Sequence, residues 1–327
     1  MPPTMKLLQI DAPGQPVWRD VPRPEPRPGE VLLQVSAVST CPHWDLHILG
    51  GEPMFADRPL TYPYVPGEPG HEVVGEVVGL GDGVEGLAVG TRVAAWRDPG
   101  GRRQGCYAEY VAVDADQVLP VPAHLSDADL APLELAMCVQ VSFDQLIARD
   151  GIRGKRVGIG GLGPAGLIAV QMAKAYGARE VVAIDPLADR RALGASLGAD
   201  VVLPPAPEAF AAGREGPMAV DTGLDTTGLK GAIEFLIARS NEAVAIFGVL
   251  REHVGFGPEH WWGGFALMGY GEHNRGAAER ALALVTDGSL RLAPLVTHTL
   301  PMSRYADGVD LLRTKEAIKV LFVPDAA

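Results

Sequence analysis

The stretch Val157-Gly-Ile-Gly-Gly-Leu-Gly-Pro-Ala-Gly166 joins a short apolar run to an alanine-rich segment that continues to Gly177. Val157–Gly160 predicts a strand and Pro164–Gly177 predicts a helix, so the pattern G-x-G-x-x-G fills the turn between them. In such a turn the first glycine permits the tight bend, the second lets backbone approach a pyrophosphate, and the third lets helix and strand pack. The context therefore predicts a dinucleotide site on the helix N-terminus. Its residues are Gly161, Gly163, Pro164, Ala165 and Gly166.

Asp185 ends the next apolar run, Val181–Ile184, about twenty residues beyond the motif. A carboxylate at this place accepts hydrogen bonds from ribose hydroxyls and repels a 2′-phosphate. Asp185 therefore favours NAD(H) over NADP(H). Arg190 lies close enough in sequence to reach the same pocket, and it favours the opposite choice.

Strand-like and helix-like segments alternate from Lys155 to about Gly288, which predicts parallel strands with crossover helices. We therefore expect an α/β fold with a doubly wound parallel sheet of the Rossmann type over residues 146–290. The segments assigned with it are strands at Val181–Ile184 and Ala243–Gly248 and helices through Leu193 and at Ala277–Val285.

The flanking segments are different in character. From Met5 to about Pro120, short Val/Leu-rich runs alternate with Pro- and Gly-bearing turns, which is typical of a small β-rich unit. A helix is expected over Ser126–Ala148, capped by Ser126, as the bridge to the second unit. The tail Pro294–Pro324 is again β-rich, with a short helix at Tyr305–Leu312. The β-rich unit is therefore expected to comprise residues 1–145 and 291–327.

The net charge, the lengths of the apolar runs and the number of cysteines restrict the kinds of partner that the protein can bind. The formal net charge of −12 over 327 residues argues against nucleic acid and anionic membrane surfaces, both of which need clustered Lys and Arg. No apolar run has the length of a membrane span, and the start has no secretory pattern, so we expect a cytoplasmic protein with a small-molecule substrate. Three cysteines do not form a disulfide framework, so each is a candidate for packing, metal binding or reactivity.

Two of these cysteines and one histidine have the residue types of a metal site. Cys41 follows the strand-like run Val31–Ala37, His71-Glu72 lies in a Pro/Gly-rich turn, and Cys138 lies on the bridging helix. Two thiolates with one imidazole match the Cys₂His arrangement of a catalytic zinc, which alcohol dehydrogenases exemplify.

Several segments of the chain resemble a known protein family. Gly70-His71-Glu72 with Gly75, Gly81 and Val84, and the segments Gly105-Cys-Tyr-Ala-Glu-Tyr110 and Ala317-Ile-Lys-Val320, are similar to zinc-containing alcohol dehydrogenases of the medium-chain dehydrogenase/reductase superfamily. The resemblance covers nearly the whole chain. It implies a GroES-like (chaperonin-10-like) catalytic domain, a Rossmann domain, and one catalytic zinc beside NAD(H). It also implies a homodimer or homotetramer that pairs near Phe265–Tyr270.

The resemblance assigns the zinc ligands residue by residue. Cys41, His71 and Cys138 are the expected ligands, with Glu72 as an adjacent carboxylate that can enter the shell. Glu134, one helical turn before Cys138, matches the glutamate of polyol-type relatives and is the alternative to Cys138. A structural zinc is not expected, because only Cys106 lies in the region where relatives carry four cysteines.

The resemblance also implies a proton relay. Asp45 corresponds to a carboxylate that holds the His71 ring by its remote N–H, although it lies four residues after Cys41 rather than the usual three. His47 is the preferred relay histidine and His43 is the second candidate.

The implied chemistry is hydride transfer between NAD(H) and an alcohol/carbonyl pair, with polyol, sugar-like or secondary alcohol substrates. Two alternatives stay open: a zinc-free quinone or enone reductase of the same fold, and a nucleotide-binding protein without turnover. The set Cys41, His71 and Cys138 argues against the first, and the shifted spacing after Cys41 favours the second.

Overall fold

The computed structural model describes residues 3–55, 58–97, 103–206 and 219–325. Contacts divide the chain into two compact units, one formed by Met1–Leu135 with Leu292–Ala327 and the other by Ala136–Arg291. The first boundary lies inside a helix, earlier than residue 145, where we expected it from sequence.

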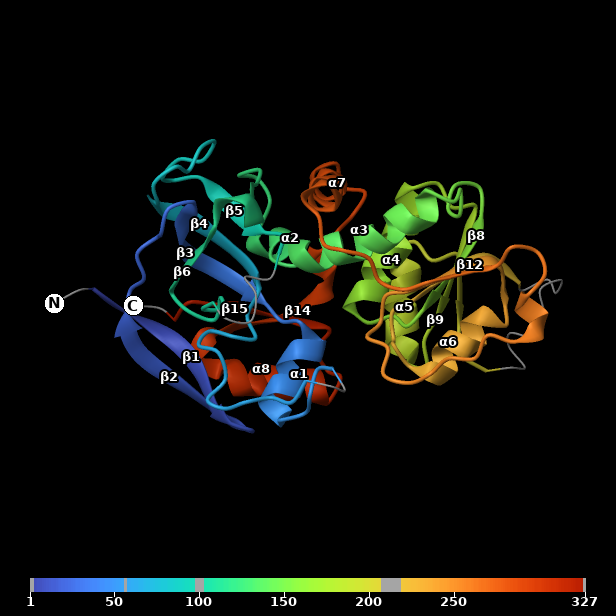
Figure 1. Ribbon diagram of the computed structural model, residues 1–327, viewed down its shortest axis with the longest axis horizontal. Coiled ribbons are helices and arrows are strands. Elements are labelled where there is room, and N and C mark those ends of the chain that lie inside the picture. Colours follow the sequence, from blue (N-terminus) through green and yellow to red (C-terminus); the bar gives the residue numbers. More distant parts are fainter. Residues whose placement is uncertain (1–2, 56–57, 98–102, 207–218, 326–327) are drawn as a thin grey trace. The chain divides into compact units, whose positions relative to one another are not determined.

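The first unit is β-rich, as the sequence predicts (Figure 1). Among its described residues, a sheet of seven strands runs in the order β14-β15-β3-β4-β5-β7, with β6 paired to β3, and β1 and β2 form a separate antiparallel pair. Its elements are β1 Thr4–Ala12, β2 Gln15–Pro22, β3 Glu30–Ser39, α1 Pro42–Gly50, β4 Glu72–Leu80, β5 Arg92–Ala95, β6 Tyr110–Asp114, η1 Ala115–Gln117, β7 Val118–Pro120, α2 Asp127–Leu130, η3 Ala293–Leu295, β14 Val296–Pro301, η4 Met302–Arg304, α8 Tyr305–Arg313 and β15 Lys319–Val323.

The C-terminal tail is part of this unit. Strand β15 pairs antiparallel with β3, with Leu321 opposite Ser39 and Phe322 opposite Val38. Tyr305 and Phe322 of the tail are buried in the same apolar core as Leu33 and Val73. The two ends of the chain therefore build one core, and β15 lies beside the end of β3.

The second unit is a doubly wound parallel sheet, and this prediction is confirmed (Figure 1). In the part of this unit that the structure describes, six strands run in the order β10-β9-β8-β11-β12-β13, each parallel to its neighbours. Helix α4 packs against β8 and β9, and α6 packs against β11 and β12. Its elements are β8 Arg156–Gly160, α4 Pro164–Ala175, β9 Glu180–Ile184, α5 Ala188–Ser196, β10 Val201–Leu203, β11 Val220–Asp225, α6 Lys230–Ile237, β12 Ser240–Ile246, η2 Pro258–His260, β13 Ala266–Met268 and α7 Arg275–Thr286.

The expected bridging helix is two helices. Ser126 caps α2 with the full capping box to Asp129, as predicted, but α2 ends at Leu130 and α3 spans Leu133–Ile147. Contrary to expectation, the stretch Asp127–Ile147 has the length and hydropathy of a membrane span. Because 83% of its most apolar window is buried inside the protein, it has the character of a core helix.

The expected pairing segment Phe265–Tyr270 contains β13, which ends the order of strands in the part of the second unit that the structure describes. Pairing of two copies along this strand stays a prediction.

Candidate functional site

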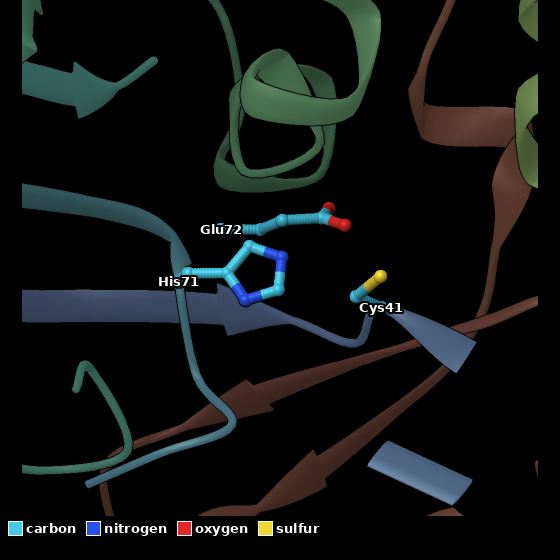
Figure 2. Close-up of side chains that lie close together, drawn as sticks. All are labelled: Cys41, His71 and Glu72. Carbon is cyan, nitrogen blue, oxygen red and sulfur yellow. The ribbon is translucent and has the colours of Figure 1, made fainter. Parts of the chain in front are cut away.

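Cys41, His71 and Glu72 converge in the first unit. Each offers one donor atom, and these atoms all lie within 4.8 Å of one another. Figure 2 shows the thiol, the imidazole and the carboxylate pointing toward a common point. His71 is 3% exposed and Glu72 is fully buried, whereas Cys41 is partly exposed, so two of the three donors are shielded from water.

The pairing of β3 with β4 brings these residues together. In this antiparallel pair Ser39, the last residue of β3, lies opposite Glu72, the first residue of β4. Cys41 therefore follows the end of one strand where His71 precedes the start of the other. Cys41 is also the N-cap residue of α1, with extended backbone at φ −99° and ψ 100°.

The His71 ring is oriented by the backbone. Its Nδ1 lies 2.9 Å from the carbonyl oxygen of Pro69. A carbonyl only accepts, so Nδ1 carries the proton and the neutral ring has its lone pair on Nε2. That Nε2 lies 3.8 Å from Glu134 Oε2, and the Glu134 side chain is 6% exposed. Glu134 thus lies beside His71, whereas the donor group that includes Cys41 is completed by Glu72.

Glu72 is held by a buried cation that sequence reasoning missed. Lys319 Nζ lies 2.7 Å from both Oε1 and Oε2 of Glu72, and both side chains are fully buried. Lys319 also donates to the Thr40 carbonyl, and Ser39 Oγ donates to Glu72. The sequence signal was a lysine inside the apolar run Ala317–Val323, because a charge buried in a strand needs a partner.

The role expected for Asp45 is wrong. Asp45 Oδ1 accepts hydrogen bonds from the hydroxyls of Tyr107 and Tyr305, each at 2.9 Å, while the remote His71 nitrogen is bound to Pro69. Burial raises the pKa of Asp45 from 3.8 to about 7, and the two tyrosine hydrogen bonds partly oppose the rise. The extra residue after Cys41 thus accompanies an aspartate that joins α1 to Tyr107, before β6, and to Tyr305 of α8, instead of orienting the His71 ring.

His43 and His47 lie one turn apart on α1, with ring centroids 4.5 Å apart. His47 Nδ1 is 3.6 Å from Glu52 Oε2, and the Glu52 side chain is 75% exposed. The two expected relay histidines therefore form a row that ends at a solvated carboxylate.

The glycine turn of the second unit has the geometry that its motif predicts. Gly161 has φ +89°, and a Cβ on Gly166 would lie 1.8 Å from the Gly161 carbonyl oxygen. A Cβ on Gly163 would meet nothing within 4 Å. Pro164 occupies the first turn of α4, where no side chain caps the N-terminus and Ala165 is buried. The first-turn amides and the space beside Gly163 fit a pyrophosphate.

Asp185 is fixed to this turn at the end of β9. Its Oδ2 accepts from the Leu162 amide and its Oδ1 from the Leu187 amide, both at 2.8 Å. Arg190 on α5 is half-buried, and burial lowers the pKa of its guanidinium while Asp185 partly opposes the shift. Asp185 therefore has a set orientation, with a cation close by.

Cys138 lies in the second unit, where its Sγ is 3.4 Å from Nε2 of His273. His273 was missed by the sequence reasoning, because it lies 135 residues from Cys138 in a segment without helix or strand. The two alternatives for the third zinc ligand lie one turn apart on α3, with their donor atoms within 4.8 Å of each other. Glu134 is 3.8 Å from His71, and Cys138 is 3.4 Å from His273.

Comparisons with known proteins match both units. The family described as alcohol dehydrogenase GroES-like domain matches residues 27–123, and the zinc-binding dehydrogenase family matches residues 164–263. L-threonine 3-dehydrogenase of Cronobacter sakazakii is 28% identical, covering 97% of this chain and 99% of that protein.

Two solved structures have the same fold over almost the full chain. A protein from Sinorhizobium meliloti, described as a zinc-binding dehydrogenase bound to NADP, has a TM-score of 0.83 at 27% identity and covers 98% of this chain and 100% of its own. The 2R,3R-butanediol dehydrogenase of Bacillus subtilis has a TM-score of 0.84 at 24% identity, with 98% and 100% covered.

Proposed function

The chain belongs to the zinc-containing medium-chain dehydrogenase/reductase superfamily, and from this premise we propose that it is an NAD(H)-linked dehydrogenase of secondary alcohols, with polyol or sugar-like substrates preferred. The observation that carries the proposal is the group of Cys41, His71 and Glu72, whose donor atoms lie within 4.8 Å of one another. The name of the threonine 3-dehydrogenase relative describes a substrate with its hydroxyl on a secondary carbon, which supports this class.

We propose Cys41, His71 and Glu134 as the protein ligands of the zinc. A thiolate, an imidazole Nε2 and a carboxylate are accepted zinc donors, and a catalytic site keeps its fourth position for water or substrate. When bound, the zinc supplies a Lewis acid that lowers the pKa of a substrate hydroxyl. Glu72 keeps its hydrogen bonds to Lys319 and Ser39, which hold its charge next to the ligands.

His43 and His47 move the hydroxyl proton toward solvent in this proposal. Imidazole titrates nearest to neutral pH, so it can accept and release a proton under working conditions. The adjacent rings of His43 and His47 and the exposed Glu52 give the proton an exit along α1. Asp45 is a positioning residue, since its carboxylate contacts two tyrosines.

The preference for NAD(H) rests on Asp185. Its carboxylate is fixed by two backbone amides at the end of β9, where its charge opposes a 2′-phosphate. Arg190 reduces this opposition, and the Sinorhizobium protein was solved with NADP. The measurement is kcat/KM for NAD⁺ against NADP⁺ in the wild type and in Asp185→Ser. We expect the NAD⁺ preference to fall more than about tenfold in the variant.

The test of the function combines metal analysis with turnover over a panel of secondary alcohols, polyols and their carbonyl products. We expect bound zinc and NAD⁺-dependent oxidation in the wild type, and we expect Cys41→Ser to lose the oxidation together with the zinc held at Cys41 and His71. Cys106→Ser is the control, because that thiol lies in the apolar core of the same unit. Full activity of metal-free Cys41→Ser toward an enone would instead support the zinc-free reductase, and nucleotide binding without turnover of any substrate would support the non-catalytic alternative.

A further inference from the structure

The segment 269–274 follows one face of α3. Gln145 Nε2 donates to the Gly269 carbonyl at 3.2 Å, a Cβ on Gly271 would lie 2.9 Å from Val141 Cγ1, and His273 reaches Cys138. Positions 138, 141 and 145 are spaced by three and four residues, which places them on one side of a helix. The contact of His273 with Cys138 is therefore part of a continuous packing interface within the second unit.

The His273 ring is held from both sides. Asn274 caps α7 by accepting from the Ala277 amide at 2.8 Å, which fixes the backbone immediately after the histidine. The Tyr270 ring meets the imidazole edge-on, with centroids 5.7 Å apart and planes at 76°. This support directs Nε2 at the Cys138 thiol rather than leaving the ring to solvent.

The separation of the two donor atoms matches a shared metal ion. Zinc binds sulfur at about 2.3 Å and histidine nitrogen at about 2.0–2.1 Å, so two such ligands in a tetrahedral shell lie roughly 3.5 Å apart. Cys138 Sγ and His273 Nε2 are 3.4 Å apart, and the cysteine is 8% exposed. The half-buried histidine leaves one side on which water can complete the shell.

We propose that Cys138 and His273 bind a second zinc ion within the second unit. Glu134, one turn earlier on α3, offers a carboxylate oxygen within 4.8 Å of the Cys138 thiol. Thiolate and imidazole are the donors that zinc prefers among protein side chains, and the pair is preformed. The site does not depend on alcohol oxidation, and it gives Cys138 a function other than ligation of the catalytic ion.

Cobalt substitution separates the two positions, because thiolate ligation to Co²⁺ gives a near-ultraviolet charge-transfer band. The chelator-treated full-length protein is titrated with Co²⁺ without oxygen. We expect two equivalents in the wild type, and in Cys41→Ser one equivalent that retains a thiolate band. Adding His273→Asn to Cys41→Ser should weaken Co²⁺ binding by more than about tenfold, the effect typical of lost metal-site partners.

The matched control is Cys41→Ser with His253→Asn, because His253 is an exposed histidine of the same unit. Circular dichroism checks that each variant is folded, and Cys138→Ser provides the second variant should His273→Asn fail to fold. A single Co²⁺ per chain carrying two thiolates, no thiolate band in Cys41→Ser, or equal binding by the His273 and His253 variants would each overturn the proposal. Turnover of alcohols by the zinc-loaded wild type is measured separately, so failure of the proposed function is distinguishable from failure of this site.

Discussion

The nucleotide turn of the second unit and the metal cluster of the first are built in opposite ways. The turn is formed by six consecutive residues, Gly161–Gly166, whose spacing is dictated by local backbone geometry. The cluster takes side chains from the end of β3, the start of β4, the start of α3 and, through Lys319, the C-terminal strand. A contiguous motif needs only its own backbone conformation, whereas buried charges need partners that are remote in sequence.

The strongest test of this difference is Lys319→Met in zinc-free protein. Removing one partner of a buried pair leaves the Glu72 charge uncompensated, so we expect a loss of about 3–5 kcal/mol in the free energy of unfolding. The double variant Glu72→Gln/Lys319→Met removes both charges and should recover much of that loss.

Urea unfolding followed by tryptophan fluorescence is suited to this measurement. Trp96 is buried in the first unit, whereas Trp261 and Trp262 of the second are each 78% exposed and change little on unfolding. If the single and the double variant were equally stable, the unpaired charge of Glu72 would not be the cause of the lost free energy of unfolding.

The matching test of the contiguous motif is Gly166→Ala. The new Cβ would lie 1.8 Å from the Gly161 carbonyl oxygen, and backbone must move to relieve this overlap. We expect the second unit to lose about 3 kcal/mol of stability, seen as faster amide hydrogen exchange in α4.

Gly163→Ala is the control for this substitution. A Cβ there meets nothing within 4 Å, so stability should be unchanged while NADH affinity falls, because the space is the one a pyrophosphate would use. Full NADH affinity in Gly163→Ala would contradict the assigned position of the phosphates.

The sequence predicted the doubly wound sheet and the return of the tail to the β-rich unit, but it missed the central strand β11. That strand reads Val220-Asp-Thr-Gly-Leu-Asp225, which resembles a turn. Asp221 accepts from the Arg156 amide, Thr222 donates to the Gly151 carbonyl, and a Cβ on Gly223 would lie 2.7 Å from Leu236. Asp221, Thr222 and Gly223 each meet a partner remote in sequence, so the alternation of polar and apolar residues along the strand does not reveal it.

The candidate site likewise contains residues that the sequence predicted and supporting groups that it did not. The donors Cys41, His71 and Glu72 were identified by residue type and resemblance, and the structure brings them together. The groups that support them, Lys319 and the carbonyl of Pro69, were missed. A lysine in an apolar strand indicates that a partner exists without identifying it, and a backbone acceptor leaves no trace in side-chain spacing.

The buried carboxyl of Asp45 provides a pH-dependent test of the first unit, in which the metal cluster is assembled from residues remote in sequence. Its folded pKa is raised to about 7 from 3.8, so the folded state retains a proton that the unfolded state releases, and stability falls as the pH rises through this interval. The expected slope is about 1.4 kcal/mol per pH unit in metal-free protein. Asp45→Asn can still accept both tyrosine hydroxyls and carries no titrating charge, so its slope should be smaller by that amount.

Urea midpoints across this pH interval measure the difference, with Asp82→Asn, an exposed aspartate of the same unit, as control. Parallel pH curves for wild type and Asp45→Asn would show that the buried carboxyl does not titrate in this interval.

The smallest effect is expected for the capping box before α2, which, like the nucleotide turn, is formed by residues close together in sequence. The Ser126 hydroxyl accepts from the Asp129 amide, and the Asp129 carboxylate accepts from the Ser126 amide. Ser126→Ala should lower stability by about 1 kcal/mol, and Ser126→Thr should restore most of it, since threonine is also a good N-cap residue. Because the box is local and solvent-exposed, its loss should leave zinc content unchanged. A loss of zinc in Ser126→Ala would show instead that the cap helps to position Glu134, and that the contiguous and assembled regions are coupled through α2 and α3.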